Sequence, residues 1–198
     1  MKSTVGRVPE WTLDRAIYHV SLHLADSVPA SEREAWIALR TELAAKAKSE
    51  SRPLTANESD MLNALYSERV EKYLAAGYGA CLLRNPKAAD SLLGILEHGN
   101  GRDYALHCLA IMPNHLHVIV QFAESDKLRP ALEQWKRISS HRINRVFGRN
   151  GQVWTNGSYT RIIRTRDEYA RQVSYVVANP EVAGLRDGFL VKEYVARV

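Results

Sequence analysis

The sequence has little of what marks a secreted or a membrane protein. Its 198 residues include only two cysteines, Cys81 and Cys108, without CxxC spacing, so neither a disulfide framework nor a thiolate zinc site is indicated. No apolar run approaches the roughly 18 residues that a membrane helix needs, and the first residues lack the apolar core of a signal peptide. We therefore expect a soluble, cytoplasmic protein with no membrane partner, with residues 1–198 forming a single domain.

Acidic residues are scarce in one part of the chain, although the net charge of the whole is only +5. Between Lys127 and Arg171 there are eleven lysines and arginines against three acids, a net of +8. Starting that window at Gln121 admits two more acids and lowers the net charge to +6. Such a segment suits a polyanionic partner, and a merely solvated basic face is the alternative.

The order of hydrophobic periodicities predicts an α+β fold. Alternation predicts a strand over 16–24, and the turn Pro113-Asn114 between two apolar runs predicts a β-hairpin. The predicted strands are 16–24, 104–111, 115–122 and 159–164, and the predicted core helices are 86–99, 128–147 and 167–179. This order matches a ferredoxin-like βαββαβ antiparallel sheet with one extra C-terminal helix, which begins near Asp167 and breaks at Asn179-Pro180.

Two further helical patterns precede the helix at 86–99. Ser31 to Glu34 has the form of a capping box that opens the first helix, and the second starts at about Asn57. We interpret residues 31–76 as an inserted helical pair that carries no recognisable chemistry, followed by a short extended piece at 80–83. Its expected inward residues are Trp36, Leu39, Leu43 and Ala47 in the first helix and Met61, Leu62, Leu65, Val70, Tyr73 and Leu74 in the second.

The run Ile111 to Val120 places two histidines, His115 and His117, one residue apart in a β-branched segment. Positions i and i+2 of a strand project from the same face, so both imidazoles can converge on one metal ion. Either histidine alone would more often be a hydrogen-bonded core or surface residue. His19 and His23 could also line a site, but the outward polar positions of a half-buried strand explain them as well, and we favour that interpretation.

Tyr175 and Asn179 lie four residues apart and so share a face of the last predicted helix. A tyrosine with a pKa of about 10 is a poor nucleophile unless its electrophile is activated, for example by a divalent ion on a phosphodiester. Asn179 could add an amide oxygen to the two imidazoles, a ligand set that suits Mg²⁺ or Mn²⁺. Taken alone, Tyr175 could equally be an amphipathic core residue, and Tyr169 on the same helix is a rival nucleophile.

Two motifs in this order resemble the single-tyrosine HUH transposases, and among them the REP-associated tyrosine transposases of bacteria. They are Met112-Pro113-Asn114-His115-Leu116-His117-Val118-Ile119-Val120 and Tyr175-Val176-Val177-Ala178-Asn179-Pro180-Glu181-Val182-Ala183-Gly184-Leu185. The resemblance implies a ferredoxin-like domain that cuts and rejoins single-stranded DNA near a hairpin. It also implies that His115 and His117 bind the metal, that Asn179 completes the metal shell, and that Tyr175 becomes a 5′-phosphotyrosine.

The leading hypothesis is therefore a DNA strand transferase, active as a monomer or a homodimer. A covalent phosphotyrosine conserves the phosphodiester energy, which agrees with the absence of a GxxxxGK[ST] nucleotide-binding loop. Arginines would contact the DNA backbone and aromatic residues would stack on bases. The candidates are Arg137, Arg142, Arg145, Arg161, Arg164 and Arg166 for the backbone and Trp154 and Tyr159 for stacking.

Two alternatives remain open at the level of sequence. The stretch after Trp154 lacks the acidic residues found there in many of these transposases, so the chain could be a domesticated binder of hairpin DNA that no longer cuts. A small-molecule metallohydrolase that uses His115 and His117 is the third hypothesis, but it leaves the basic segment unexplained.

Overall fold

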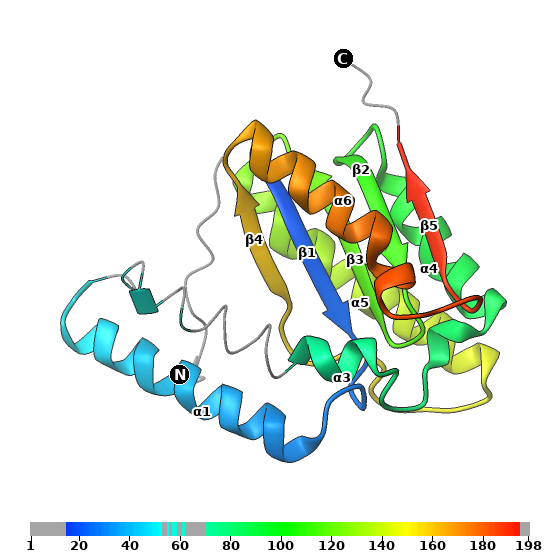
Figure 1. Cartoon of the computed structure of the whole chain (residues 1–198), viewed down its shortest axis with the longest axis horizontal. Helices are drawn as coiled ribbons and strands as arrows, with labels where there is room; N and C mark the ends of the chain where they lie inside the picture. Colours follow the sequence, from blue (N-terminus) through cyan, green and yellow to red (C-terminus); the bar gives the residue numbers. More distant parts are fainter. Residues whose placement is uncertain (1–14, 53–54, 56, 59–60, 62–69, 195–198) are drawn as a thin grey trace.

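The structure is a computed structural model that describes residues 15–52, 55, 57, 58, 61 and 70–194. Its centre is a five-stranded sheet in the order β4-β1-β3-β2-β5, in which every neighbouring pair is antiparallel (Figure 1). The strands are β1 (Ile17–His23), β2 (Ala105–Ile111), β3 (His115–Gln121), β4 (Tyr159–Ile163) and β5 (Leu190–Glu193).

The predicted βαββαβ order is confirmed. β1, α4 (Pro86–Gly99), β2, β3, α5 (Leu128–Val146) and β4 follow one another as expected, and α6 (Arg166–Val182) is the extra helix. The hairpin of β2 and β3 is also confirmed. The strand β5 is not among the predicted elements. It is short, only half buried and paired along the outer edge of β2, so it leaves little alternation in the sequence.

The two faces of the sheet are covered by different helices. Tyr18, Val20 and Leu22 of β1 and Leu116 and Val118 of β3 belong to a large apolar core with α4 and α5. The opposite face, which is toward the viewer in Figure 1, lies under α6. A smaller apolar cluster there includes Cys108, Ile119 and Val176. Because strand side chains alternate, each central strand contributes to both layers.

The helix α6 begins near Asp167, as predicted, but ends later than predicted. Thr165 is the N-cap, and its hydroxyl accepts a hydrogen bond from the Glu168 backbone N–H at 3.1 Å. The helix does not break at Asn179-Pro180, as predicted, but continues through Pro180 to Val182. A proline in the last turn removes only one backbone donor close to the point where the helix ends anyway.

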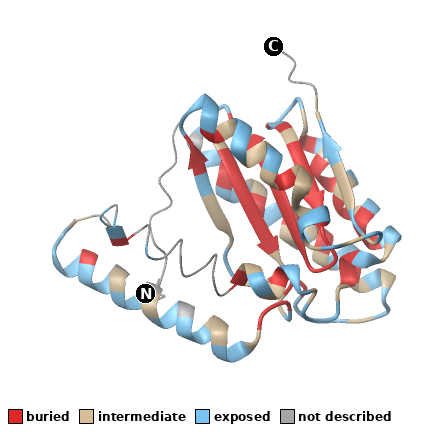
Figure 2. Cartoon of the chain, viewed as in Figure 1, coloured by how far each residue is buried: buried red, intermediate tan, exposed pale blue. Residues whose placement is uncertain are grey.

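The first inserted helix, α1 (Ala30–Ser49), extends away from the sheet and is mostly exposed (Figures 1 and 2). Its N-cap is Pro29 and no side chain caps it, so the predicted capping box at Ser31 is wrong. Of its expected inward residues, Ala47 is buried and both Leu39 and Leu43 are half-buried. The side chain of Trp36 lies outside the described part of the structure.

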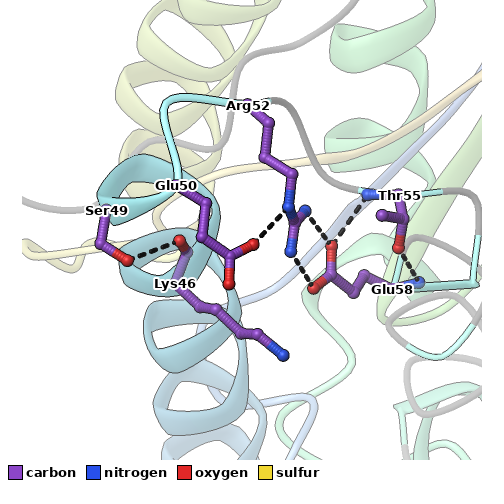
Figure 3. Close-up of polar contacts among 6 residues, drawn as sticks. All are labelled: Lys46, Ser49, Glu50, Arg52, Thr55 and Glu58. Carbon is purple, nitrogen blue, oxygen red and sulfur yellow. Dashed lines mark hydrogen bonds and ion pairs between the residues drawn. The ribbon is translucent and has the colours of Figure 1, made fainter.

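A polar cluster follows α1 (Figure 3). The Arg52 guanidinium donates to both oxygens of Glu58 at 2.7 and 2.9 Å, a bidentate pair. Thr55 and Glu58 bond reciprocally through side chain and backbone N–H, which is a capping box. It starts the helical residues at Asn57, the start predicted for the second inserted helix.

The insertion ends with α3 (Lys72–Ala75). Val70 and Leu74 are buried as predicted, whereas Met61 is 52% exposed and not inward. Leu62 and Leu65 lie outside the described residues. The predicted extended piece at 80–83 is instead a 3-10 turn, η2 (Leu82–Arg84), and a second such turn, η3 (Ser125–Lys127), precedes α5. Within the described residues, no helix is long and apolar enough to cross a membrane.

Candidate active site

The sheet face under α6 carries a row of polar side chains from β1 and β3. The antiparallel register sets Ser21 opposite His117 and His23 opposite His115. Partners in an antiparallel pair project from the same face, so His19 joins the row as a diagonal neighbour of His117. All three of His19, His115 and His117 are at most 3% exposed.

The imidazoles of this row contact one another. The His115 and His117 ring centroids are 4.7 Å apart, and those of His19 and His117 are 5.2 Å apart. His117 Nδ1 lies 2.7 Å from Ser21 Oγ and 3.1 Å from His19 Nε2. The predicted convergence of the two β3 histidines on one face is confirmed, and the cluster is larger than predicted.

Hydrogen bonds to Asn114 fix the His115 ring. The Asn114 amide donates to the Tyr78 carbonyl at 3.0 Å, which turns its Oδ1 toward His115 Nδ1 at 2.7 Å. His115 Nδ1 therefore carries the proton, and its Nε2 presents a lone pair. An outer hydrogen bond that orients an imidazole in this way is the usual support of a metal-binding histidine.

The helix α6 presents three polar side chains to this row. Gln172, Tyr175 and Asn179 follow the spacing of one helix face. Gln172 makes a side-chain hydrogen bond with His19, and Asn179 makes one with His115, each of which raises the pKa of the histidine it contacts. Between them, the Tyr175 ring lies edge-on, with its centroid 5.4 Å from that of His117 and 5.8 Å from that of His19.

Burial keeps these imidazoles neutral. It lowers the pKa of His19 to about 4 and that of His115 to about 3, and it also lowers the pKa of His117. The positive charge that neighbouring histidines would carry adds to the effect on His115 and His117. A metal ligand must be deprotonated, so imidazoles that stay neutral well below pH 7 are suited to that task.

The Tyr175 hydroxyl is held by the insertion. It donates a hydrogen bond to Glu71 Oε1 at 3.0 Å. Glu71 directly precedes α3, and its neighbours Val70 and Leu74 pack with Val28 and Tyr159. The insertion therefore brings a carboxylate to the site, which the sequence did not indicate. No local motif could have indicated this, because Glu71 and Tyr175 are 104 positions apart.

Two of the proposed DNA-contacting residues lie beside the cluster, on β4. Tyr159 stands opposite Ser21 and Arg161 opposite His19 in the β1–β4 pair. The Tyr159 and His19 ring centroids are 6.2 Å apart. Arg161 is paired with Glu168, from Nη2 to Oε1 at 2.8 Å. Arg164 and Arg166 are exposed where β4 leads into α6. We refer to Tyr159, Arg161, Arg164 and Arg166 together as the rim residues.

The other proposed contacts are not brought to the site. Arg137, Arg142 and Arg145 are exposed, but α5 packs on the opposite face of the sheet. Trp154 is 3% exposed, and its indole N–H donates to Ser139 Oγ at 2.7 Å. Its proposed role in base stacking is therefore corrected, because the ring has no free face in this structure.

His19 and His23 are also corrected. They do not point into solvent as the outward side of a half-buried strand. His19 is buried under α6, and His23 Nδ1 lies 3.0 Å from Ser27 Oγ. The alternation that identified the strand could not show this, because the sequence pattern is the same whether water or a helix covers the polar side of the strand.

The residues present fit a divalent metal ion. Among the described residues, no group of three or more His, Cys, Asp or Glu is arranged to hold a metal. Asn179, which contacts both His115 and Tyr175, is the amide that could join the two imidazoles as a ligand. Two neutral nitrogens with an amide oxygen suit Mn²⁺ better than Mg²⁺, which prefers oxygen ligands.

No family model and no curated protein matches the chain. Among solved structures, it is similar to a REP-associated tyrosine transposase bound to a REP hairpin. That alignment has 13% identity, covers 90% of this chain and 74% of the other, and has a TM-score of 0.48. It is also similar to a candidate transposase from Deinococcus radiodurans R1, with 15% identity, 89% and 95% coverage and a TM-score of 0.37.

Proposed function

We propose that the protein is a metal-dependent endonuclease and strand transferase that acts on single-stranded DNA near hairpins through a 5′-phosphotyrosine. The observation that carries this proposal is a phenol beside a pair of neutral imidazoles: the ring centroids of Tyr175 and His117 are 5.4 Å apart, and those of His117 and His115 are 4.7 Å apart. Hairpin DNA is the substrate class that the sequence resemblance implies.

His115, His117 and Asn179 would hold the metal, Mn²⁺ or Mg²⁺. When bound, such an ion supplies Lewis acidity at a phosphodiester oxygen. The chain's own contribution is to keep both imidazoles neutral by burial and to orient His115 through Asn114. The fixed rings need no reorganisation when substrate arrives.

Tyr175 would attack the scissile phosphorus in line with the departing 3′ oxygen. The DNA downstream of the cut would stay attached to the phenol, and the 3′-hydroxyl would leave and later return for rejoining. All the proposed groups come from one chain. The rim residues Tyr159, Arg161, Arg164 and Arg166 would guide the strand by stacking and phosphate contacts.

The test is covalent capture of DNA by the full chain with Mn²⁺. A hairpin oligonucleotide labelled at its 3′ end should become a denaturation-resistant protein adduct, whereas the 5′-labelled one should yield a shorter free strand. Tyr175→Phe should abolish the adduct. Adduct formation should also stop in EDTA and return with added Mn²⁺.

Tyr169→Phe is the matched control, since Tyr169 lies on the same helix but its hydroxyl contacts His107 Nδ1 at 2.9 Å. It should leave the adduct intact. Loss of the adduct in Tyr169→Phe but not in Tyr175→Phe would show that the nucleophile is misassigned.

A binder of hairpin DNA that does not cut is the second candidate. One observation favours it: the Tyr175 hydroxyl is engaged by Glu71, and burial, with that carboxylate, raises the Tyr175 pKa. Hairpin affinity that falls steeply with salt, without any adduct in wild type, would establish the binder.

A further inference from the structure

The contact between Glu71 and Tyr175 has two properties that a chance surface contact lacks. It is directed, since the phenol donates to a carboxylate oxygen at 3.0 Å. It is also anchored, because Val70 and Leu74, on either side of Glu71, are 4% and 3% exposed in a cluster with Val28. The carboxylate is therefore held at the one atom that the proposed chemistry requires to react.

Building on the proposed function, we propose that Glu71 is the catalytic proton acceptor of Tyr175, supplied by the inserted segment. As the phenol oxygen bonds to phosphorus and the P–O3′ bond breaks, the phenolic proton moves to the Glu71 carboxylate. The leaving 3′ oxygen takes a proton from solvent water and departs as a 3′-hydroxyl, and the hydroxide that remains is neutralised by the buffer. In rejoining, the 3′-hydroxyl gives its proton to solvent as it attacks phosphorus, and the Glu71 carboxylic acid returns its proton to the phenol oxygen as the P–O bond to Tyr175 breaks.

The Tyr175 hydroxyl needs a proton acceptor if it is to act as a nucleophile. A phenol with the usual pKa of about 10 is almost fully protonated at neutral pH, so it must lose a proton as it attacks. Asn179 also bonds the phenol, but an amide does not accept a proton at neutral pH. General base catalysis by a positioned carboxylate typically contributes about 10²- to 10⁴-fold in rate.

The test compares the rate of adduct formation in the full chain with Mn²⁺ and a 3′-labelled hairpin. Glu71→Gln keeps the size and a hydrogen-bonding oxygen but is not basic, so we expect the rate to fall by about 10²-fold or more. Hairpin affinity and melting temperature should stay close to those of wild type.

The matched control is Glu32→Gln. Glu32 is also in the insertion and also faces a tyrosine hydroxyl, that of Tyr73 at 3.4 Å. It does not contact Tyr175, so its rate should equal that of wild type.

A second measurement separates proton transfer from mere support of the site. A fluorinated tyrosine of lower phenol pKa, incorporated at position 175, needs less help to lose its proton. It should raise the rate of adduct formation in Glu71→Gln by at least about tenfold. A rate lost through a structural defect would not be restored in this way.

The remaining outcomes are distinct. An unchanged rate in Glu71→Gln, or no rescue by the fluorinated phenol, overturns the assignment while leaving the proposed function intact. A faster rate would show that Glu71 covers the nucleophile and repels phosphate, which also overturns it. If wild type forms no adduct with any hairpin, the proposed function itself fails.

Discussion

The two faces of the sheet are made by the same strands but bury different chemistry. On the side of α4 and α5, residues such as Leu116 and Val118 form a continuous apolar core. On the side of α6, His115 and His117 of the same strand meet polar side chains, and the apolar cluster is small. The comparison teaches that stability and chemistry are divided between faces, so neighbouring residues of β3 should respond very differently to substitution.

The sharpest test of that division substitutes two adjacent residues of β3. Leu116→Ala should lower the free energy of unfolding by about 3 kcal/mol, since it leaves a cavity in the apolar core. His117→Ala should cost about 1 kcal/mol or less, because releasing a buried imidazole from desolvation offsets its lost contacts. Under the proposed function its adduct formation should nonetheless fall by about 10³-fold, because one of the proposed metal ligands is removed.

Urea unfolding and covalent capture per folded molecule measure the two effects. The proposed division between the two faces is wrong if Leu116→Ala loses as much adduct formation as His117→Ala under conditions where both are folded. It is also wrong if His117→Ala is the less stable of the two.

A second prediction concerns the acid sensitivity of the polar face. The pKa of His19 is about 4 in the folded chain against 6.5 in a free imidazole. The unfolded chain therefore binds a proton below pH 6.5 that the folded chain does not bind until about pH 4. The stability due to neutral His19 is complete above pH 6.5 and declines as the pH falls, by about 2 kcal/mol at pH 5.

Urea unfolding in EDTA at pH 7 and pH 5 tests this. His19→Gln should make the loss between these pH values smaller than in wild type. Tyr18 is the neighbouring residue of β1 and faces the apolar core, so Tyr18→Phe should show the same loss of stability between pH 7 and pH 5 as wild type. Equal pH dependence in all three proteins would contradict the shift assigned to His19.

The smallest expected effect concerns Trp154. Trp154→Phe removes the hydrogen bond from the indole to Ser139 and should cost about 1 kcal/mol of stability. Hairpin affinity should not change, because the ring is buried on the core side. A tenfold loss of affinity with unchanged stability would show instead that Trp154 reaches the DNA. Tyr159→Ala at the site rim provides the comparison, since there affinity should fall.

Local pattern predicted most of the fold because short-range spacing sets the direction of side chains. The alternation of β1, the turn at Pro113-Asn114 and the helical period from Pro86 to Gly99 each appear as predicted. The errors lie where local signals are weak or compete. The capping pattern at Ser31 predicted a helix start there, but the helix begins at Ala30. The strand β5 is too short and too exposed to leave a strong alternation in the sequence.

The sequence by itself determined the order of elements in the βαββαβ unit and the helix after it, the common face of His115 and His117, and the one-turn spacing of Tyr175 and Asn179. Those features depend on residues a few positions apart, for which backbone geometry alone decides direction. Only the tertiary structure decided that His19 is buried against His117, that the α5 arginines lie across the sheet, and that Glu71 reaches the Tyr175 hydroxyl. These contacts join residues far apart in the chain, and they follow from which surfaces pack together to exclude water.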